Sequence, residues 1–291
     1  MISQRILIIA SKNEIEAVYR LSKSFNVTGL YMIDGSIPEN LSIPTGPSFE
    51  DLLEKSQPDH CVILAALPSL CEHIKMLLSG EVSILAAGPI KGIASNGNNI
   101  TVVPPSKWSL PYQQIKAECR KESFGEPVYL RYLTSGGHNL HSAWWAVCQA
   151  VDVADGLLQG ALTALHVSGI SHNQTCHINA TLLMSNRANG QLSIVPNYLE
   201  DERQVTLLGT GGLLNYDPQE NVAGIVTGQR LITYKRIDQC SYTNWLTAYL
   251  KDRKTLSARN QTVLSTDQSD VIFDAVKVAI AAPKPVRVEL N

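Results

Sequence analysis

The sequence lacks three features that would assign it to a specialised class of protein. Its six cysteines form no CxxC pair, which argues against a structural zinc site and against a thioredoxin-like redox site. No apolar run approaches the roughly 20 residues that cross a membrane as a helix. The formal net charge is only −2, so nothing indicates a nucleic-acid partner or an anionic membrane surface. Because the N-terminus shows no signal-peptide pattern, we expect a cytoplasmic protein.

Two further signatures are missing. There is no Gly-x-Ser-x-Gly turn of the serine hydrolases and no phosphate-binding loop of the Walker type. His166, His172 and His177 lack the close spacing of metal ligands, so we expect no metal site. The remaining composition, with 44% apolar and 17% charged residues over 291 positions, is ordinary for a folded protein and allows two domains.

The first hundred residues alternate between strand and helix patterns. Continuous apolar runs bounded by turns are typical of strands whose two faces are both covered. The predicted strands are 5–10, 27–33, 60–66, 82–86 and 100–103, and the predicted helices are 15–25, 48–55 and 70–78. Repeated strand–helix–strand units predict an α/β architecture with a doubly wound parallel sheet.

The turn after the first strand has the frame of a dinucleotide-binding turn without its glycines. A glycine-rich turn lets backbone amides approach a pyrophosphate at the start of the helix. Here Ser11, Lys12 and Asn13 occupy the turn, and Glu14 places a negative charge where phosphate would lie. The second strand leads to Asp34, where such folds place the acid that binds a ribose hydroxyl. An acid before a glycine also forms a simple turn, so both roles remain open for Asp34.

From about residue 124 the pattern changes to an α+β type. The predicted strands are 128–134, 176–184, 190–195, 204–208, 212–216, 229–234 and 286–290, and the predicted helices are 142–158, 242–251 and 267–281. Alternating polar and apolar positions are typical of an antiparallel sheet with one face against helices. We therefore predict two domains, a nucleotide-binding type of domain in residues 1–122 and an open-sheet domain in residues 123–291.

Three stretches of the second half are similar to those of a known family. Residues 125–131 are similar to the entry into its second domain, residues 202–214 to the hairpin that closes its large sheet, and residues 269–288 to its last helix and closing strand. With the order of elements, they make nearly the whole chain resemble the Gfo/Idh/MocA oxidoreductases. The resemblance implies a Rossmann domain followed by a domain with a large open antiparallel sheet. It also implies an NAD(P)-dependent oxidoreductase acting on a small, sugar-like carbonyl or alcohol.

The chain departs from the family pattern at the residues that carry chemistry. The glycine-rich turn corresponds to residues 10–14. The Glu-Lys-Pro motif, whose lysine usually contacts cofactor and substrate, falls on Ala87-Gly88-Pro89. The Asp…His pair of the first helix of the second domain has no clean counterpart, and Asp152 is the nearest acid. These losses favour altered or lost activity.

The resemblance also indicates where ligands would bind. NAD or NADP would contact six residues of the first domain: Ser11, Lys12, Asp34, Leu67, Pro68 and Gly88. The substrate would enter between the domains near the glycine-bearing loop 135–141. There His138, His141 and Asp152 are candidate acid/base groups, and Trp144 would line the pocket.

Two functions from different classes remain open. The first is a divergent NAD(P)-dependent oxidoreductase with a small-molecule substrate. The second is a non-catalytic relative that keeps the fold as a binding or assembly subunit, because a fold alone does not confer chemistry. Its open sheet would pair with another copy or with a partner enzyme. The residues have structural alternatives too: the loop histidines as solvent-exposed imidazoles, and Asp152 with Asp155 as a solvated helix edge or as partners of a nearby arginine.

Overall fold

A computed structural model shows two compact units, each built from segments that are distant in the sequence. The first unit comprises Met1–Trp108 and Cys240–Thr266, and the second comprises Ser109–Gln239 and Asp267–Asn291. The structure describes residues 4–36, 41–46, 48–66, 70–93, 99–173, 175–196, 203–217, 222–227, 230–235, 241–251, 263–282 and 284–290. The second unit thus begins at residue 109, whereas the sequence pattern predicts a boundary after residue 122.

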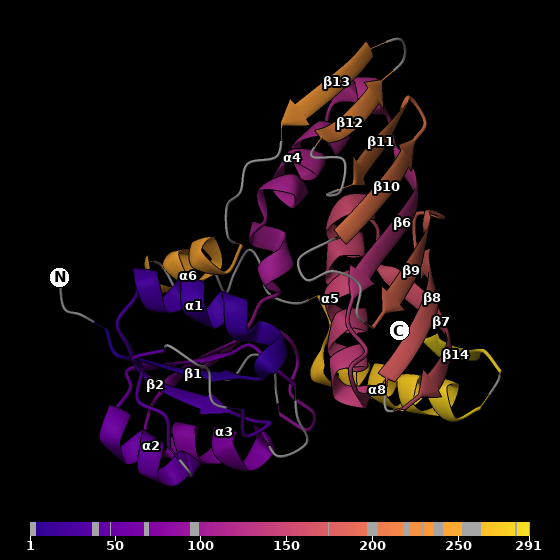
Figure 1. The fold of residues 1–291 in the computed structure, drawn as a ribbon. Helices are drawn as coiled ribbons and strands as arrows, with labels where there is room; N and C mark the ends of the chain where they lie inside the picture. Colours follow the sequence, from indigo (N-terminus) through magenta and orange to yellow (C-terminus); the bar gives the residue numbers. More distant parts are fainter. Residues whose placement is uncertain are drawn as a thin grey trace. The chain divides into compact units, whose positions relative to one another are not determined.

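Five parallel strands form the sheet of the first unit (Figure 1). The strands are β1 (Ile6–Ala10), β2 (Val27–Met32), β3 (His60–Ile63), β4 (Ser83–Ala86) and β5 (Ile100–Val102), and the helices are α1 (Ile15–Ser24), α2 (Phe49–Ser56), α3 (Leu70–Ser79) and α6 (Ser241–Lys251). The strands pair in the order β2-β1-β3-β4-β5. Helices α1 and α6 lie over one face and α2 and α3 over the other, so every residue of β1 and β5 is buried. This is a Rossmann-like doubly wound sheet.

Helix α6 belongs to the first unit although it comes from the second half of the chain. It packs against α1 and against the short 3-10 helix η2 (Pro105–Trp108). Trp245 and Tyr249 of α6 are buried, and the Tyr249 ring centroid lies 5.6 Å from that of His60 at the start of β3. The helix itself was predicted at residues 242–251, but no local pattern indicates which unit it covers.

An aromatic cluster of the first unit makes its stability sensitive to pH. The ring centroid of His73 on α3 lies 4.4 Å from that of Phe49 and 5.1 Å from that of Tyr31. Burial lowers the pKa of His73, and this effect outweighs the negative charges of Glu50 and Glu72, which raise it. The folded state therefore binds this proton less readily than the unfolded chain. The free energy of unfolding falls as the pH drops from about 6.5 through the lower folded-state pKa.

We expect His73→Gln to remove this contribution. Urea unfolding of both proteins at about pH 7 and about pH 5.5 measures it, because the wild type should lose more stability across that interval than the variant does. Equal losses in the two proteins would contradict the assignment to His73.

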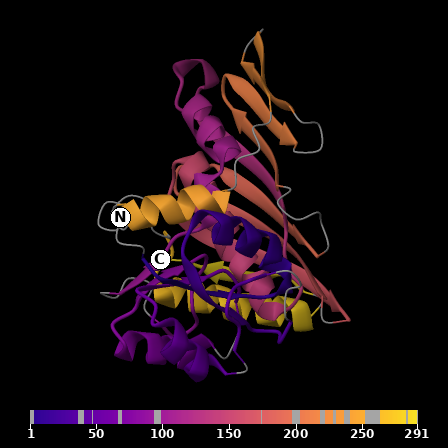
Figure 2. The same cartoon turned by 60° about the vertical axis from the view of Figure 1, so that its left-hand side comes forward.

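A nine-stranded sheet dominates the second unit (Figure 2). Its strands are β6 (Pro127–Ser135), β7 (Leu162–His172), β8 (Thr175–Met184), β9 (Asn189–Val195), β10 (Arg203–Gly209), β11 (Gly212–Asp217), β12 (Val222–Thr227), β13 (Arg230–Lys235) and β14 (Val286–Glu289). They pair in the order β13-β12-β11-β10-β6-β9-β8-β7-β14. Only β6 and β9 pair in parallel among these neighbours.

Helices cover one face of this sheet. They are α4 (Leu110–Cys119), α5 (Leu140–Leu158) and α8 (Thr266–Ala281). Helix α5 packs on β6, β8 and β9. Residues of β8 alternate between buried and exposed positions, as expected when one face meets helices and the other is open. The hydrophobic core of the unit therefore lies between α5, α8 and the inner face of the sheet.

The fold class predicted from the sequence is confirmed: a parallel, doubly wound sheet is followed by a large, mostly antiparallel sheet. Strands β7 and β12 and helix α4 were not predicted. Strand β7 contains Ser168-Gly169, which weakens the apolar alternation. Helix α4 carries Pro111 in its first turn after the cap Ser109, and no helix was predicted for this segment. None of the described helices combines the length and apolar character needed to span a bilayer.

Candidate functional site

The turns at the carboxyl edge of the five-stranded sheet are where doubly wound folds bind their ligands. In the first unit β1 leads to Ser11, β2 leads to Asp34 and β4 leads to Gly88. Three of the predicted cofactor residues, Ser11, Lys12 and Asp34, are brought together at the turn between β1 and α1 by hydrogen bonds.

Ser11 caps the 3-10 helix η1 (Lys12–Glu14), which runs directly into α1. The Glu14 carboxylate accepts hydrogen bonds from the backbone amide of Ser11 at 2.9 Å and from the Ser11 hydroxyl at 2.6 Å. The Ser11 hydroxyl oxygen in turn accepts from the amide of Asn13 at 3.3 Å. This is a capping box, and it directs a carboxylate onto the first amide of the turn.

Asp34 binds the same turn from the end of β2. Its carboxylate accepts from the amide of Lys12 at 2.9 Å and from the amide and hydroxyl of Ser36 at 3.2 and 2.6 Å. Partial burial by itself would raise the pKa of Asp34, but the hydrogen bonds from Ser36 and Lys12 outweigh it and lower the pKa. A charged Asp34 thus holds the turn at neutral pH.

Two carboxylates therefore occupy the amides that a pyrophosphate needs. In a glycine-rich turn such amides point at phosphate oxygens. Here the amides of Ser11 and Lys12 donate to Glu14 and Asp34, while the Lys12 side chain is exposed. In this conformation the residues present do not fit a dinucleotide bound through its pyrophosphate. The contacts of Asp34 with Lys12 and Ser36 are those of a turn-forming residue, and they leave no sign of a ribose-binding role in this conformation.

The other predicted cofactor residues add no charge to this edge. Gly88 lies buried just beyond β4, at the position of the family's lysine. Because glycine has no side chain, no ammonium group extends from this position. Lys91 is exposed, and its backbone carbonyl accepts the thiol of Cys71 at 3.0 Å. Leu67 and Pro68 lie outside the described residues.

The loop of the second unit that was predicted to bind substrate is fixed by backbone contacts. The carbonyl of Gly137 accepts the amide of Cys176 at 2.6 Å, which ties the loop to the start of β8. Asn139 accepts the amide of Ser142 at 2.9 Å and caps α5. His138 is half-buried in this loop.

His141 and Trp144 both contact helix α8. Trp144 is 1% exposed, its Nε1 donates to the carbonyl of Ser269 at 2.8 Å, and its ring meets Phe273 edge to face at 5.3 Å. His141 lies in the first turn of α5, with its ring centroid 5.1 Å from that of Phe273. Trp144 therefore packs in the hydrophobic core of the second unit, and its contacts offer no support for a role in lining an open pocket.

Asp152 is buried on α5, with 2% of its surface exposed, so the alternative of a solvated helix edge is wrong for this residue. Tyr112 on α4 lies near it, and its hydroxyl is buried without a hydrogen-bond partner among the described residues. Burial, and then the charges of Asp152 and Asp155, raise the pKa of Tyr112. Sequence spacing could not indicate Tyr112, because it lies on a different helix, one that was not predicted.

The described cysteines and acids indicate neither thiol nor metal chemistry. Burial raises the pKa of Cys119 to about 12, and burial with the nearby Asp152 and Asp270 raises the pKa of Cys148. These two thiols stay protonated at neutral pH, so they are not activated nucleophiles. Across the described ranges, no group of three or more His, Cys, Asp or Glu side chains could hold a metal ion.

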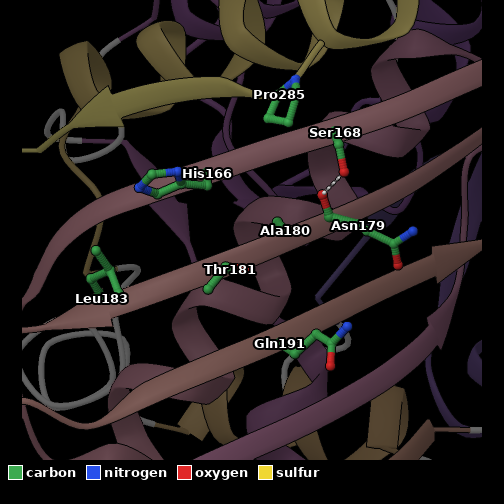
Figure 3. Close-up of a pocket in the computed structure, with 8 residues that line it drawn as sticks. All are labelled: His166, Ser168, Asn179, Ala180, Thr181, Leu183, Gln191 and Pro285. Atoms are coloured by element: carbon green, nitrogen blue, oxygen red, sulfur yellow. Dashed lines mark hydrogen bonds between the residues drawn. The ribbon is translucent and has the colours of Figure 1, made fainter. Parts of the chain in front are cut away.

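Two adjoining depressions lie on the outer face of the nine-stranded sheet over β7 and β8, and Figure 3 shows the one that His166, Thr181 and Gln191 line. Their volumes are about 410 and 470 Å3, and both are lined by Ser168, Asn179 and Pro285. No sequence motif indicates this surface, because its residues come from two strands and are brought together by their pairing.

Solved structures resemble this fold over nearly the whole chain, while the sequence matches no protein-family model and no curated protein. UDP-N-acetylglucosamine 3-dehydrogenase GnnA of Acidithiobacillus ferrooxidans is 14% identical at a TM-score of 0.67, with 96% of this chain and 98% of that chain covered. An oxidoreductase of Agrobacterium radiobacter in complex with NAD+, L-tartaric acid and magnesium is 13% identical at a TM-score of 0.66, with 98% of each chain covered. The dehydrogenase MviM of Clostridium difficile is 16% identical at a TM-score of 0.61, with 95% of this chain and 92% of that chain covered.

These likenesses show the fold. The chain has the two-unit fold of Gfo/Idh/MocA-type oxidoreductases and dehydrogenases, so the resemblance inferred from the sequence is confirmed at the level of fold.

Proposed function

We propose that this chain keeps the fold of a dinucleotide-dependent dehydrogenase but serves as a non-catalytic binding subunit. The observation that carries the proposal is the pair of carboxylates, Glu14 and Asp34, on the amides of Ser11 and Lys12. A pyrophosphate would have to displace both carboxylates and then lie beside their negative charges. The replacement of the family's lysine by Gly88 also supports the proposal, because that lysine usually contacts cofactor and substrate.

A thermal-shift titration with NADH and NADPH tests this function. A ligand that binds only the folded state stabilises it by mass action, by about 2.7 kcal/mol at a concentration 100 times its Kd. We expect no rise in Tm with either dinucleotide. A clear rise with one of them would overturn the proposal.

The second candidate is an NAD(P)-dependent oxidoreductase that acts on a small, sugar-like carbonyl or alcohol. It is favoured by the fold likeness to GnnA and to the Agrobacterium radiobacter oxidoreductase in complex with NAD+. In this case Lys12 would bind phosphate by charge, and His138, His141 and Asp152 would remain the candidates for proton transfer.

Asp34→Ala separates the two candidates. If Asp34 binds a ribose hydroxyl, the variant binds NADH more weakly than the wild type does. If Asp34 only holds the amide of Lys12, its removal leaves dinucleotide affinity unchanged or increases it. Fluorescence titration with NADH measures the difference.

A further inference from the structure

Strand β14 lies at one end of the nine-stranded sheet (Figure 1), with β7 as its single neighbour among the described strands. The two strands pair antiparallel over Val286–Glu289, and the Leu290 amide continues the ladder by donating to the carbonyl of Thr163 at 2.9 Å. Hydrogen-bonded positions alternate along an antiparallel pair. The amides and carbonyls of Arg287 and Glu289 therefore point away from β7, and no backbone partner for them occurs in the part of the chain that the structure describes.

The side chains of this edge strand differ between its two faces, because successive residues of a strand point to opposite sides. Val286, Val288 and Leu290 share one side, on which Val288 and Leu290 are buried and Val286 is half-buried. Arg287 and Glu289 share the other side, are both exposed, and form an ion pair in which Nε lies 2.5 Å from Oε1. The edge thus combines an apolar row on one face with one charge of each sign on the other.

The edge lacks the features that usually keep an exposed strand from pairing with another chain. Natural proteins protect such edges with lysine or proline in the strand, with a bulge, with an inward-pointing charge, or with a covering segment. Val286–Glu289 contains neither lysine nor proline, and its pairing with β7 shows no bulge. At β2, an edge of the first unit's sheet, Leu30 instead donates to the carbonyl of Pro44 and forms a bridge with Thr45. The backbone of β14 is therefore open to a further strand.

We propose that β14 pairs with β14 of a second copy of this chain, antiparallel and about a two-fold axis at Val288. In this register Arg287 lies opposite Glu289 of the second copy, and the two residues exchange both of their backbone hydrogen bonds. Opposite charges directly across a pair of strands stabilise it. Val288 then meets its own equivalent, and Val286 lies opposite Leu290, so the apolar row continues from one copy into the other.

The two charges select this register. Residues that lie directly opposite each other in an antiparallel pair share a face, so the axis can pass through Arg287, Val288 or Glu289. An axis at Arg287 would place two arginines opposite each other, and an axis at Glu289 would place two glutamates opposite each other. Like charges in that position are destabilising, which leaves the axis at Val288.

The pairing ends at a dimer, because both copies use the same edge and no second edge of this kind is created. Two short strands bury little surface, so we expect a weak dimer with a Kd in the micromolar range. The contact lies at the edge of the sheet, whereas the pairing expected from the sequence uses its open face. The proposal does not depend on whether the first unit binds a dinucleotide.

Sedimentation velocity of the whole chain from about 1 to about 300 μM measures the association, and hydrogen exchange at both ends of this range locates it. We expect the amides of Arg287 and Glu289 to become protected at the higher concentration. Arg287→Pro should weaken the dimer at least about tenfold, because proline removes one edge amide from each copy. That amide points away from β7, so the ladder inside the chain is kept.

Three further variants separate the causes. Arg287→Gln removes the same charge but keeps the amide, so it should weaken the dimer less than Arg287→Pro does. Arg287→Glu should weaken the dimer by opposing two glutamates, and combining it with Glu289→Arg should restore the association. Ile170→Asp changes a side chain of β7 that is 63% exposed, on the open face rather than at the edge, and should leave the association unchanged.

Three results would overturn the proposal. The first is a chain that stays monomeric over the whole concentration range. The second is a dimer in which the amides of Arg287 and Glu289 exchange as fast as they do in the monomer. The third is a dimer that Ile170→Asp abolishes and Arg287→Pro leaves intact, because the copies would then meet through the open face of the sheet. A double charge exchange that fails to restore the association would refute the register with its axis at Val288.

Discussion

Gly137→Ala should lower the free energy of unfolding by at least about 4 kcal/mol, at the upper end of single-substitution effects. Gly137 has a φ of +77°, and a Cβ there would overlap the backbone carbonyl oxygen of Cys176. The new Cβ is attached directly to the backbone and would meet backbone atoms of Cys176, so no side chain can rotate to relieve the overlap. The loop would therefore have to move away from the start of β8. Thermal unfolding should show a fall in Tm of more than about 8 °C.

Gly92→Ala is the matched control for this substitution. Gly92 has a similar φ of +71°, but no atom of the described residues lies within 4 Å of its Cβ position. Alanine there bears only the strain of a left-handed backbone, about 1–2 kcal/mol. If both variants lost the same stability, the contact between Gly137 and Cys176 would not be the cause.

Glu14→Ala should increase the affinity for NADH and NADPH at least about tenfold, equivalent to 1.4 kcal/mol. Removing the carboxylate frees the amide of Ser11, which donates to it at 2.9 Å, and takes a negative charge away from the start of the helix. A hydrogen bond from an amide to a charged group contributes about 1.5–3 kcal/mol. Fluorescence titration at millimolar dinucleotide should therefore detect binding to the variant that the wild type does not show.

Glu16→Ala provides the control for net charge. Glu16 lies two residues after Glu14 in the first turn of α1, is exposed, and forms an ion pair with Arg20 at 2.9 Å. Its removal changes the net charge by the same amount without freeing the amide of Ser11. An equal gain in affinity for both variants would show that long-range charge, and not the capping carboxylate, limits dinucleotide binding.

The elements with strong local signals could be predicted from the sequence. Strands β1 and β3 are continuous apolar runs, and Ser48 is a typical helix cap whose hydroxyl accepts the amide of Asp51 at 3.1 Å at the start of α2. Strands that are buried on both faces and helix caps are both indicated by residues that are neighbours in the sequence. A parallel sheet with its helices can therefore be predicted without tertiary information.

The closure of the turn between β1 and α1 was only half predictable. The spacing of Ser11 and Glu14 matches the capping-box pattern, and the negative charge at the helix start was anticipated. The bond from the Lys12 amide to Asp34 joins residues from two strands, so no local pattern contains it. The groove over β7 and β8 was missed for the same reason, since Ser168 and Asn179 become neighbours only through strand pairing.

The return of α6 to the first unit has a practical consequence for dissecting the molecule. A fragment that ends at residue 108 would leave out the helix that packs on α1 and η2, exposing the apolar surface that Trp245 and Tyr249 cover. Such a truncated half should aggregate or stay unfolded, and co-expression with a peptide spanning 240–266 should rescue its solubility. The two units are thus built from alternating segments of the chain. We therefore expect them to fold cooperatively rather than as two independent domains.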